Sequence, residues 1–440
     1  MRQACREQRS TLFASMMSQA PAKPDDPIGL SLLMALGFAG LCAINLAIPG
    51  KPYFDEIHYL PAARELLERG LYINREHPLF AKQLIALGIA LFGDNPLGWR
   101  IFSVTAGALA LFASMRAMWF SSLSRFATLS YGALLASGFL LYVQSRIAML
   151  DIFMAAFLAV GAWQFVAAMR EPETGRYRLI VCGVAIGLAM GSKWNAFALA
   201  PLPGVVFFLA RLSAGRRRLF TSKRGIPIRG MSLVEAFVWL GLLPLTIYAL
   251  TFAPAWELKD TPFAAQNLIS FHREMLALQM DVIKPHPYQS NWPDWVTNTR
   301  AIWYLYENVD GAQRGVLLVG NPLTMLLGLA ALIWCMVSGL MQREWARLGV
   351  VAGYLTSLGL WFAAAKPVQF YYHYFVPSFF LLAALALALD ALWSAGHRKL
   401  AGGVIAASLA LFMGFYPILS AAPLADETSF LHWTWIQGWR

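Results

Sequence analysis

The chain has 440 residues, of which 58% are hydrophobic and only 13% are charged, and its formal net charge is +11. A soluble protein of this length would carry roughly twice that share of charged residues, so the composition excludes an ordinary soluble enzyme. The excess of basic residues does not indicate nucleic-acid binding, because these residues gather in short segments between apolar runs. Runs of about 17–25 apolar residues recur along the chain and predict an all-α integral membrane protein.

The apolar runs predict about eleven membrane-spanning helices. They form one transmembrane domain over residues 28–420, preceded by a polar, basic tail of residues 1–27 and followed by a tail of residues 421–440. The predicted spans, in chain order, are Ile28–Ile48, Leu97–Trp119, Phe126–Val143, Ile152–Met169, Leu179–Met190, Ala196–Leu212, Leu233–Phe252, Val316–Leu340, Leu348–Ala364, Phe370–Trp393 and Ala401–Leu419.

Loop charge orients these spans. Basic residues occupy the N-terminal tail and the segments after the second, fourth, sixth, eighth and tenth spans. They are Arg2, Arg6, Arg9, Arg116, Arg125, Arg170, Arg176, Arg178, Arg211, Arg216, Arg217, Arg218, Lys223, Arg224, Arg229, Arg343, Arg347, His397, Arg398 and Lys399. Positively charged loops favour the cytoplasm, so all these clusters are cytoplasmic if the N-terminal tail is. We therefore expect a multi-pass protein of the inner, or plasma, membrane, with residues 421–440 outside the cytoplasm.

Two large loops are predicted to face outward, residues 51–96 and residues 253–315. The first contains the apolar run Pro78–Phe92, which we assign to a helix at the membrane interface or a re-entrant helix. Counting it as a span would place every later basic cluster on the wrong side. The four cysteines, Cys5, Cys42, Cys182 and Cys335, show no metal-ligand spacing, so neither a zinc site nor a disulfide framework is predicted.

Ionisable residues gather at the predicted outward ends of the spans. The candidates for a site are Asp55, Glu56, Glu76, His77, Arg100, Arg146, Asp151, Lys193 and His373, with Lys366 nearby. Charged groups at this depth are costly, so each needs a partner or a function. A cation at headgroup depth can hold a lipid phosphate, and a carboxylate can deprotonate a hydroxyl that attacks a sugar carbon. Because phosphate leaves readily, one base suffices, and attack opposite the leaving group inverts the anomeric centre.

Each group also has a purely structural interpretation. Asp55 could cap a helix that runs from Glu56 to Arg69 and ends at Gly70. Arg146 and Asp151 could form an ion pair at a helix junction. Lys193 could extend from a helix end to the membrane surface, and His77 could be an ordinary loop histidine.

Several segments resemble motifs of the protein O-mannosyltransferases, which are GT-C glycosyltransferases of family 39. The segments are Tyr53–Tyr59, Glu76–Lys82, Asn95–Arg100, Ser145–Asp151, Gly191–Trp194, His286–Trp292, Gly320–Pro322 and Phe370–Phe375. Their order and spacing carry the resemblance, which extends from Pro52 to Trp439.

The resemblance implies an eleven-span GT-C fold, a polyprenyl-phosphate donor that usually carries mannose, and Ser or Thr hydroxyls of exported proteins as acceptors, met at the secretion translocon. It assigns acceptor activation to Asp55, the donor side to Glu56 and the carrier phosphate to Arg100. It carries over less directly to Glu76, His77, Arg146, Asp151, Lys193 and His373 as donor-binding residues. The loop at 253–315 is too short for the β-trefoil insert of eukaryotic members, which indicates a bacterial form. No cofactor is expected, and the basic residues make a metal unnecessary for holding one phosphate.

Two other functions stay open from the sequence. A transferase of the same fold could modify lipid A or another envelope glycan, as the aminoarabinose transferases do, although His286-Pro287-Tyr288 and Tyr372-His373-Tyr374 favour a protein acceptor. A transporter would place charges at the bilayer midplane, often in repeated halves. Here the ionisable residues lie at one predicted surface and no halves repeat, so a transporter is the weaker alternative.

Overall fold

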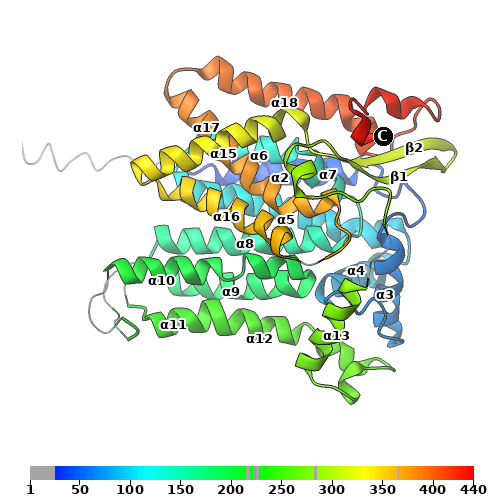
Figure 1. Ribbon diagram of the computed structural model, residues 1–440, viewed down its shortest axis with the longest axis horizontal. Helices are drawn as coiled ribbons and strands as arrows, with labels where there is room; N and C mark the ends of the chain where they lie inside the picture. Colours follow the sequence, from blue (N-terminus) through cyan, green and yellow to red (C-terminus); the bar gives the residue numbers. More distant parts are fainter. Residues whose placement is uncertain are drawn as a thin grey trace, which may run out of the picture.

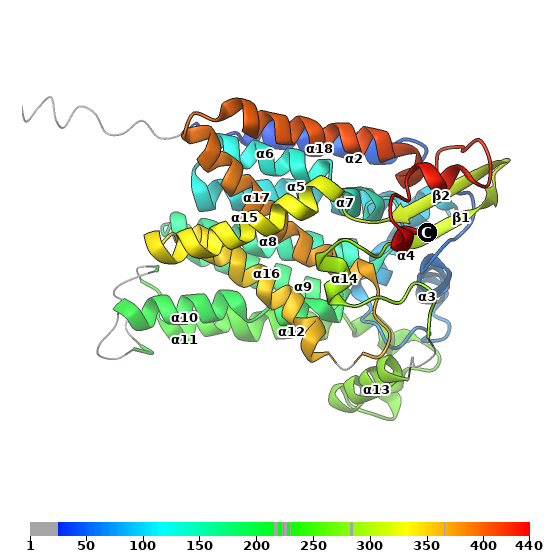
Figure 2. The ribbon, with the colours of Figure 1, turned by 45° about the horizontal axis from the view of Figure 1, so that its top comes forward.

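The computed structural model describes residues 25–214, 219–221, 223, 227–228, 230–281, 285–364 and 366–440. Its long helices lie side by side along the longest axis of the molecule (Figures 1 and 2). The bundle contains α2 (Ile28–Ala43), α5 (Pro96–Ser122), α6 (Arg125–Ala136), α7 (Phe139–Gln144), α8 (Leu150–Arg170), α9 (Gly175–Ser192), α10 (Leu202–Ala214), α11 (Leu233–Phe237), α12 (Leu243–Leu250), α15 (Pro322–Gln342), α16 (Trp345–Ala363), α17 (Phe375–Ser394) and α18 (Arg398–Leu419).

Within the described part of the chain, eight helical segments are long and apolar enough to cross a membrane. They are Pro96–Ser122, Leu150–Arg170, Trp194–Leu212, Leu233–Glu257, Pro322–Gln342, Trp345–Ala363, Tyr371–Ser394 and Arg398–Leu419. Each coincides with a predicted span. The other three predictions fall on the 16-residue α2, on α6 and α7, which are separate helices, and on the 18-residue α9. The multi-pass architecture is confirmed, and the count of eleven stays a prediction.

One end of the bundle carries the shorter elements. These are α3 (Glu56–Glu68), α4 (Phe80–Phe92), α13 (Leu268–Met280), α14 (Trp292–Val296) and the antiparallel strands β1 (Ile302–Val309) and β2 (Ala312–Leu318). Figure 1 shows α3, α4, α13 and the hairpin together at this end, with the C-terminus. We call it the site end. Helix α4 lies on the run Pro78–Phe92 and, at 13 residues, is shorter than a full span.

The structure corrects the boundaries of two predicted spans. The eighth predicted span began at Val316, but residues up to Leu318 belong to β2, and α15 begins only at Pro322. The second outward loop is thus partly a sheet. The first predicted span also ends early, because α2 stops at Ala43 and Asn45 has a φ of 52°.

The opposite end of the bundle holds described residues of the predicted cytoplasmic clusters, such as Arg116 and Arg170. Arg116, in α5, pairs with Asp26 just before α2, with Nη2 2.7 Å from Oδ2. Arg170, at the end of α8, donates to the carbonyl of Phe120 over 3.0 Å. The residues Arg2, Arg6, Arg9, Arg216, Arg217, Arg218, Arg224, Arg229 and Cys5 lie outside the described part of the chain. The other three cysteines are buried and free.

Candidate active site

Glu56 and Arg100 form a fully buried ion pair beneath the start of α3. The Arg100 Nε and Nη2 atoms each donate to the Glu56 carboxylate over 2.8 Å, and both side chains are 0% exposed. Glu56 also accepts hydrogen bonds from the backbone N–H groups of Ala148 and Tyr53, over 3.0 and 3.3 Å. A carboxylate with this many donors is held rigidly and has little capacity for a substrate.

The remaining N–H groups of Arg100 bind the chain between α2 and α3. Nη1 donates to the carbonyls of Leu46 and Pro49 over 3.1 and 2.8 Å, and Nη2 donates to that of Lys51 over 3.1 Å. A guanidinium has five N–H groups, and all five are therefore occupied. This geometry argues against the predicted contact between Arg100 and a carrier phosphate.

Arg146 serves the same stretch of chain from the α7–α8 junction. Its guanidinium donates to the carbonyls of Ile44 and Asn45 over 2.6 and 3.2 Å and lies over the Tyr142 ring, 5.4 Å from its centroid. The structural alternative of an Arg146–Asp151 pair is wrong, because Asp151 pairs with Lys193 instead. Their Nζ and Oδ2 atoms lie 2.6 Å apart, and both side chains are almost completely buried.

Asp55 is the N-cap residue of α3 and is half-buried. The charges of Lys193 and Asp151 both act on its carboxylate. Its carboxylate does not cap the helix by a side-chain hydrogen bond. The Tyr59 hydroxyl approaches Oδ2 at 3.4 Å. Burial raises the pKa of Asp55, while Lys193 opposes the rise and Asp151 adds to it. A carboxylate of raised pKa that is not consumed by a helix cap is suited to accept a proton.

The loop before α4 brings Glu76 and His77 to the same region. Lys82, 0% exposed, donates to the carbonyls of Asn74 and His77 over 2.5 and 3.0 Å and so fixes the turn between them. The Glu76 carboxylate accepts a 2.6 Å bond from the Asn74 amide. His77 Nδ1 is buried with no hydrogen-bond partner among the described atoms. Burial, with Lys193 next in effect, lowers the pKa of His77 well below its ordinary value, so its ring is neutral at pH 7.

A cavity of about 390 Å³ opens beside these groups. Its ionisable lining residues are His77, Lys193, His272 and Lys366, and no Asp or Glu is among the described residues that line it. Trp361 forms part of another wall. Burial and the neighbouring Lys193 lower the pKa of Lys366 to about 8. Lys366 is not among the candidate site residues predicted from the sequence, although it lies at a predicted outward boundary. Its position just before the Phe370–Phe375 motif was the available signal.

His373 packs below this cavity, in the short helix Tyr371–Tyr374. Its ring stacks on Trp361 with centroids 3.7 Å apart, and Nδ1 accepts the N–H of Phe370 over 3.1 Å. Its Nε2 atom is buried with no partner among the described atoms. Tyr372, the neighbouring residue, faces the Lys193 ammonium, which lies 4.9 Å from its ring centroid.

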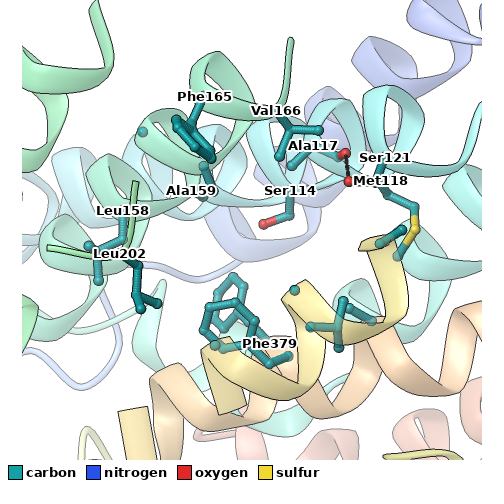
Figure 3. Close-up of a pocket in the computed structure, with 18 of the residues that line it drawn as sticks. Ser114, Ala117, Met118, Ser121, Leu158, Ala159, Phe165, Val166, Leu202 and Phe379 are labelled. Carbon is teal, nitrogen blue, oxygen red and sulfur yellow. Dashed lines mark hydrogen bonds between the residues drawn. The ribbon is translucent and has the colours of Figure 1, made fainter. Parts of the chain in front are cut away.

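A second, larger cavity of about 600 Å³ lies within the bundle. Its walls come from α5, α8, α10, α16 and α17, and Figure 3 shows Leu158, Phe165, Leu202 and Phe379 around it. The lining is almost wholly apolar. Both cavities are bordered by the segment that begins at Trp194 and by α16, the smaller one near the C-terminal end of α16 and the larger one along its N-terminal half.

The structure therefore brings His77, Lys193 and Lys366 to the wall of the first cavity. Asp151 pairs with Lys193, and Asp55 is close enough for Lys193 to affect its pKa. Glu76 precedes His77, and His373 stacks on Trp361 in the cavity wall. It places Glu56, Arg100 and Arg146 underneath as a supporting layer. No group of three or more His, Cys, Asp or Glu side chains that could hold a metal ion occurs among the described residues.

Two family models match most of the chain. The model described as dolichyl-phosphate-mannose-protein mannosyltransferase matches residues 94–258. The model described as the C-terminal four-transmembrane region of protein O-mannosyltransferase matches residues 264–439.

Curated relatives match over almost their whole length. The polyprenol-phosphate-mannose–protein mannosyltransferase of Mycolicibacterium smegmatis (strain MKD8) is 28% identical, covering 97% of both chains. The Mycobacterium tuberculosis protein of the same name is 26% identical, covering 94% of this chain and 91% of the relative. The Corynebacterium glutamicum protein of that name is 24% identical over 92% of this chain and 91% of the relative.

Two solved structures share the fold. The Saccharomyces cerevisiae protein O-mannosyltransferase Pmt1-Pmt2 complex bound to the sugar donor superposes with a TM-score of 0.82 at 14% identity, covering 97% of this chain and 94% of that one. ArnT from Cupriavidus metallidurans bound to undecaprenyl phosphate gives a TM-score of 0.58 at 17% identity, covering 86% and 63%.

Proposed function

Because this chain belongs to the protein O-mannosyltransferase family, we propose that it transfers mannose from a polyprenyl-phosphate carrier to Ser or Thr hydroxyls of exported proteins. The observation that carries the proposal is the half-buried Asp55 carboxylate beside a cavity lined by Lys193 and Lys366. We place the site on the non-cytoplasmic face of the inner membrane, because it lies at the end of the bundle opposite the basic loops. Meeting the acceptor at the secretion translocon is part of the same proposal.

Asp55 acts as the general base in this mechanism. As the acceptor oxygen attacks C1 of the sugar, its proton passes to the Asp55 carboxylate. The bond between C1 and the phosphate oxygen breaks, its electron pair leaves with the polyprenyl phosphate, and the configuration at C1 inverts. The raised pKa of Asp55 improves the match between the base and an operating pH near neutrality.

Lys193 and Lys366 hold the carrier phosphate in our proposal. Both line the same cavity, and a phosphate between two ammonium groups gains charge-assisted hydrogen bonds. Asp151 fixes the position of Lys193 through their 2.6 Å ion pair. The apolar cavity of Figure 3, bordered by the same helices, is suited to the polyprenyl chain.

Arg100 has a different role from the one the motif resemblance implies. Its bonds to Glu56 and to three carbonyls fasten the chain on both sides of Asp55. We therefore propose that Arg100 and Glu56 position Asp55 and do not touch the donor. Arg146 holds the neighbouring carbonyls in the same way.

The cavity also weighs against an aminoarabinose-type donor. An amino sugar brings its own positive charge, and the ionisable groups that line this cavity are two lysines and two histidines. A neutral sugar on a phosphate meets no such repulsion.

Transfer assays with purified protein in liposomes test the proposal. The donor is polyprenyl-phosphate mannose, and the acceptors are a Ser/Thr peptide and, separately, lipid A. Mannose on the peptide, found by mass spectrometry and lost in Asp55→Asn, supports the proposal. Transfer to lipid A alone, or no transfer to either, refutes it.

A further inference from the structure

A row of aromatic rings leads from the neighbourhood of Asp55 to the surface of the site end. We call it the aromatic row, and its members in spatial order are Tyr304, Phe54, Tyr372, Phe370, His286 and Tyr288. Successive ring centroids lie 3.9, 6.0, 5.5, 5.1 and 5.7 Å apart. The row joins three segments far apart in sequence: the first outward loop, the second outward loop and the chain before α17.

Hydrogen bonds to backbone carbonyls hold the outer part of the row in place. The N–H of Ser290 donates to the carbonyl of Gln369 over 3.0 Å, and the Gln289 amide donates to that of Pro367 over 3.1 Å. From the other side, Arg300 donates to the carbonyl of Pro287 over 2.6 Å. The segment His286–Trp292, whose role the catalytic cluster leaves unassigned, is therefore fixed against the residues that precede Tyr371.

The row reaches the surface at its outer end, where His286 is exposed. Tyr304 and Tyr372 are buried, Phe54, Phe370 and Tyr288 are half-buried, and His286 is exposed. Its second member adjoins the proposed base directly, since Phe54 precedes Asp55 in the chain. None of its members lines the cavity that holds Lys193 and Lys366. Asp55 thus neighbours the aromatic row through Phe54, while Lys193 of the cavity acts on its charge.

We propose that the aromatic row is the docking path of the acceptor polypeptide, which lies along it in an extended conformation with its hydroxyl at Asp55. The inference rests on the proposed function, because the cationic cavity is then occupied by the donor and the row remains for the acceptor. Half-buried Asp55 beside buried Tyr372 admits an extended segment more readily than a folded surface. Aromatic side chains give rigid, largely apolar contact area at low entropic cost, so the row favours apolar residues on either side of the Ser or Thr.

Steady-state kinetics with two acceptors test the proposal. One is a peptide with a single Thr flanked by apolar residues, and the other is a blocked threonine amide too short to reach the outer row. The His286→Ala/Tyr288→Ala double variant should raise the peptide KM about 3- to 10-fold, the size of a lost aromatic contact. Its KM for the donor and its rate with the blocked threonine should not change. Tyr288→Phe should recover most of the affinity lost in Tyr288→Ala.

A matched control and a folding measurement complete the test. Trp256, 63% exposed and outside the row, should give an unchanged peptide KM when replaced by Ala. An unchanged peptide KM in the double variant overturns the proposal. An equal loss with both acceptors at an unchanged melting temperature overturns it too, because the row would then support the site and not the peptide. If the unaltered protein transfers mannose to lipid and not to peptide, the proposed function itself fails, and that result is read before any variant is made.

Discussion

The Arg100 guanidinium donates two hydrogen bonds of 2.8 Å each to the Glu56 carboxylate, and neither side chain is exposed. Glu56 follows Asp55 in the chain, so the Arg100–Glu56 ion pair fixes the position of the proposed base. The three carbonyls that Arg100 also binds belong to the chain before Asp55. One buried cation thus fixes the catalytic segment from both sides.

Arg100→Lys should therefore destabilise the fold and leave the donor Kd almost unchanged. A lysine cannot replace five N–H groups in a fixed plane, and disrupting a buried ion pair costs about 3–5 kcal/mol. We expect a clear fall in the melting temperature in detergent, with the donor Kd of the folded fraction unchanged. Intact stability combined with weakened donor binding would instead restore Arg100 as a phosphate ligand.

The pH dependence of kcat/KM for the donor should reflect the titration of the Lys366 amine. Its pKa of about 8 in the free protein means that it carries a charge below pH 8 and loses it above. A neutral amine holds phosphate poorly, so kcat/KM for the donor should fall as the pH rises through about 8. In Lys366→Arg the cation persists at all these pH values, and the fall should disappear. A fall at the same pH in both proteins would assign the titration to another group.

Hydropathy was sufficient to predict the helical bundle, because it follows from the energetics of each segment in a bilayer. Loop charge predicted the end of the bundle at which the candidate residues lie together. The partners of the charged side chains could not be predicted in this way. The sequence suggested Arg146 as the partner of Asp151, and only the packing of α8 beside α9 brings Lys193 to it. The partners of Arg100 include three backbone carbonyls, which no side-chain pattern records.

The hairpin left a signal that was not used. Asp310-Gly311 separates two apolar runs, which is a strong short-range indication of a two-residue hairpin turn. Both residues have positive φ, 50° and 73°, as that turn requires. Val316–Leu318 was instead absorbed into a membrane span, because an apolar strand and the start of an apolar helix look alike in a hydropathy plot.

Cysteine labelling tests the orientation of the bundle. Leu71, 50% exposed in the first outward loop, and Met341, 80% exposed near the opposite end of α15, are suitable positions. The native Cys42, Cys182 and Cys335 are buried, and Cys5 would be replaced by Ser. In intact cells an impermeant maleimide should label Leu71→Cys and spare Met341→Cys. Labelling only at position 341 would reverse the orientation and place the site in the cytoplasm.

Asp55→Asn should abolish most of the turnover while the protein still folds. Little stability should be lost for two reasons. Asparagine has the same shape and caps helices equally well, and the Asp55 side chain makes no capping bond in the structure. General base catalysis is worth about 10²–10⁴-fold in rate, and kcat should fall by that factor with the donor KM little changed. Because burial raises the pKa of Asp55, the acid side of the wild-type pH profile should also lie above the ordinary carboxyl range. Near-normal turnover in folded Asp55→Asn would remove Asp55 as the base, and Asp151, which also faces Lys193, would be the next carboxylate to test.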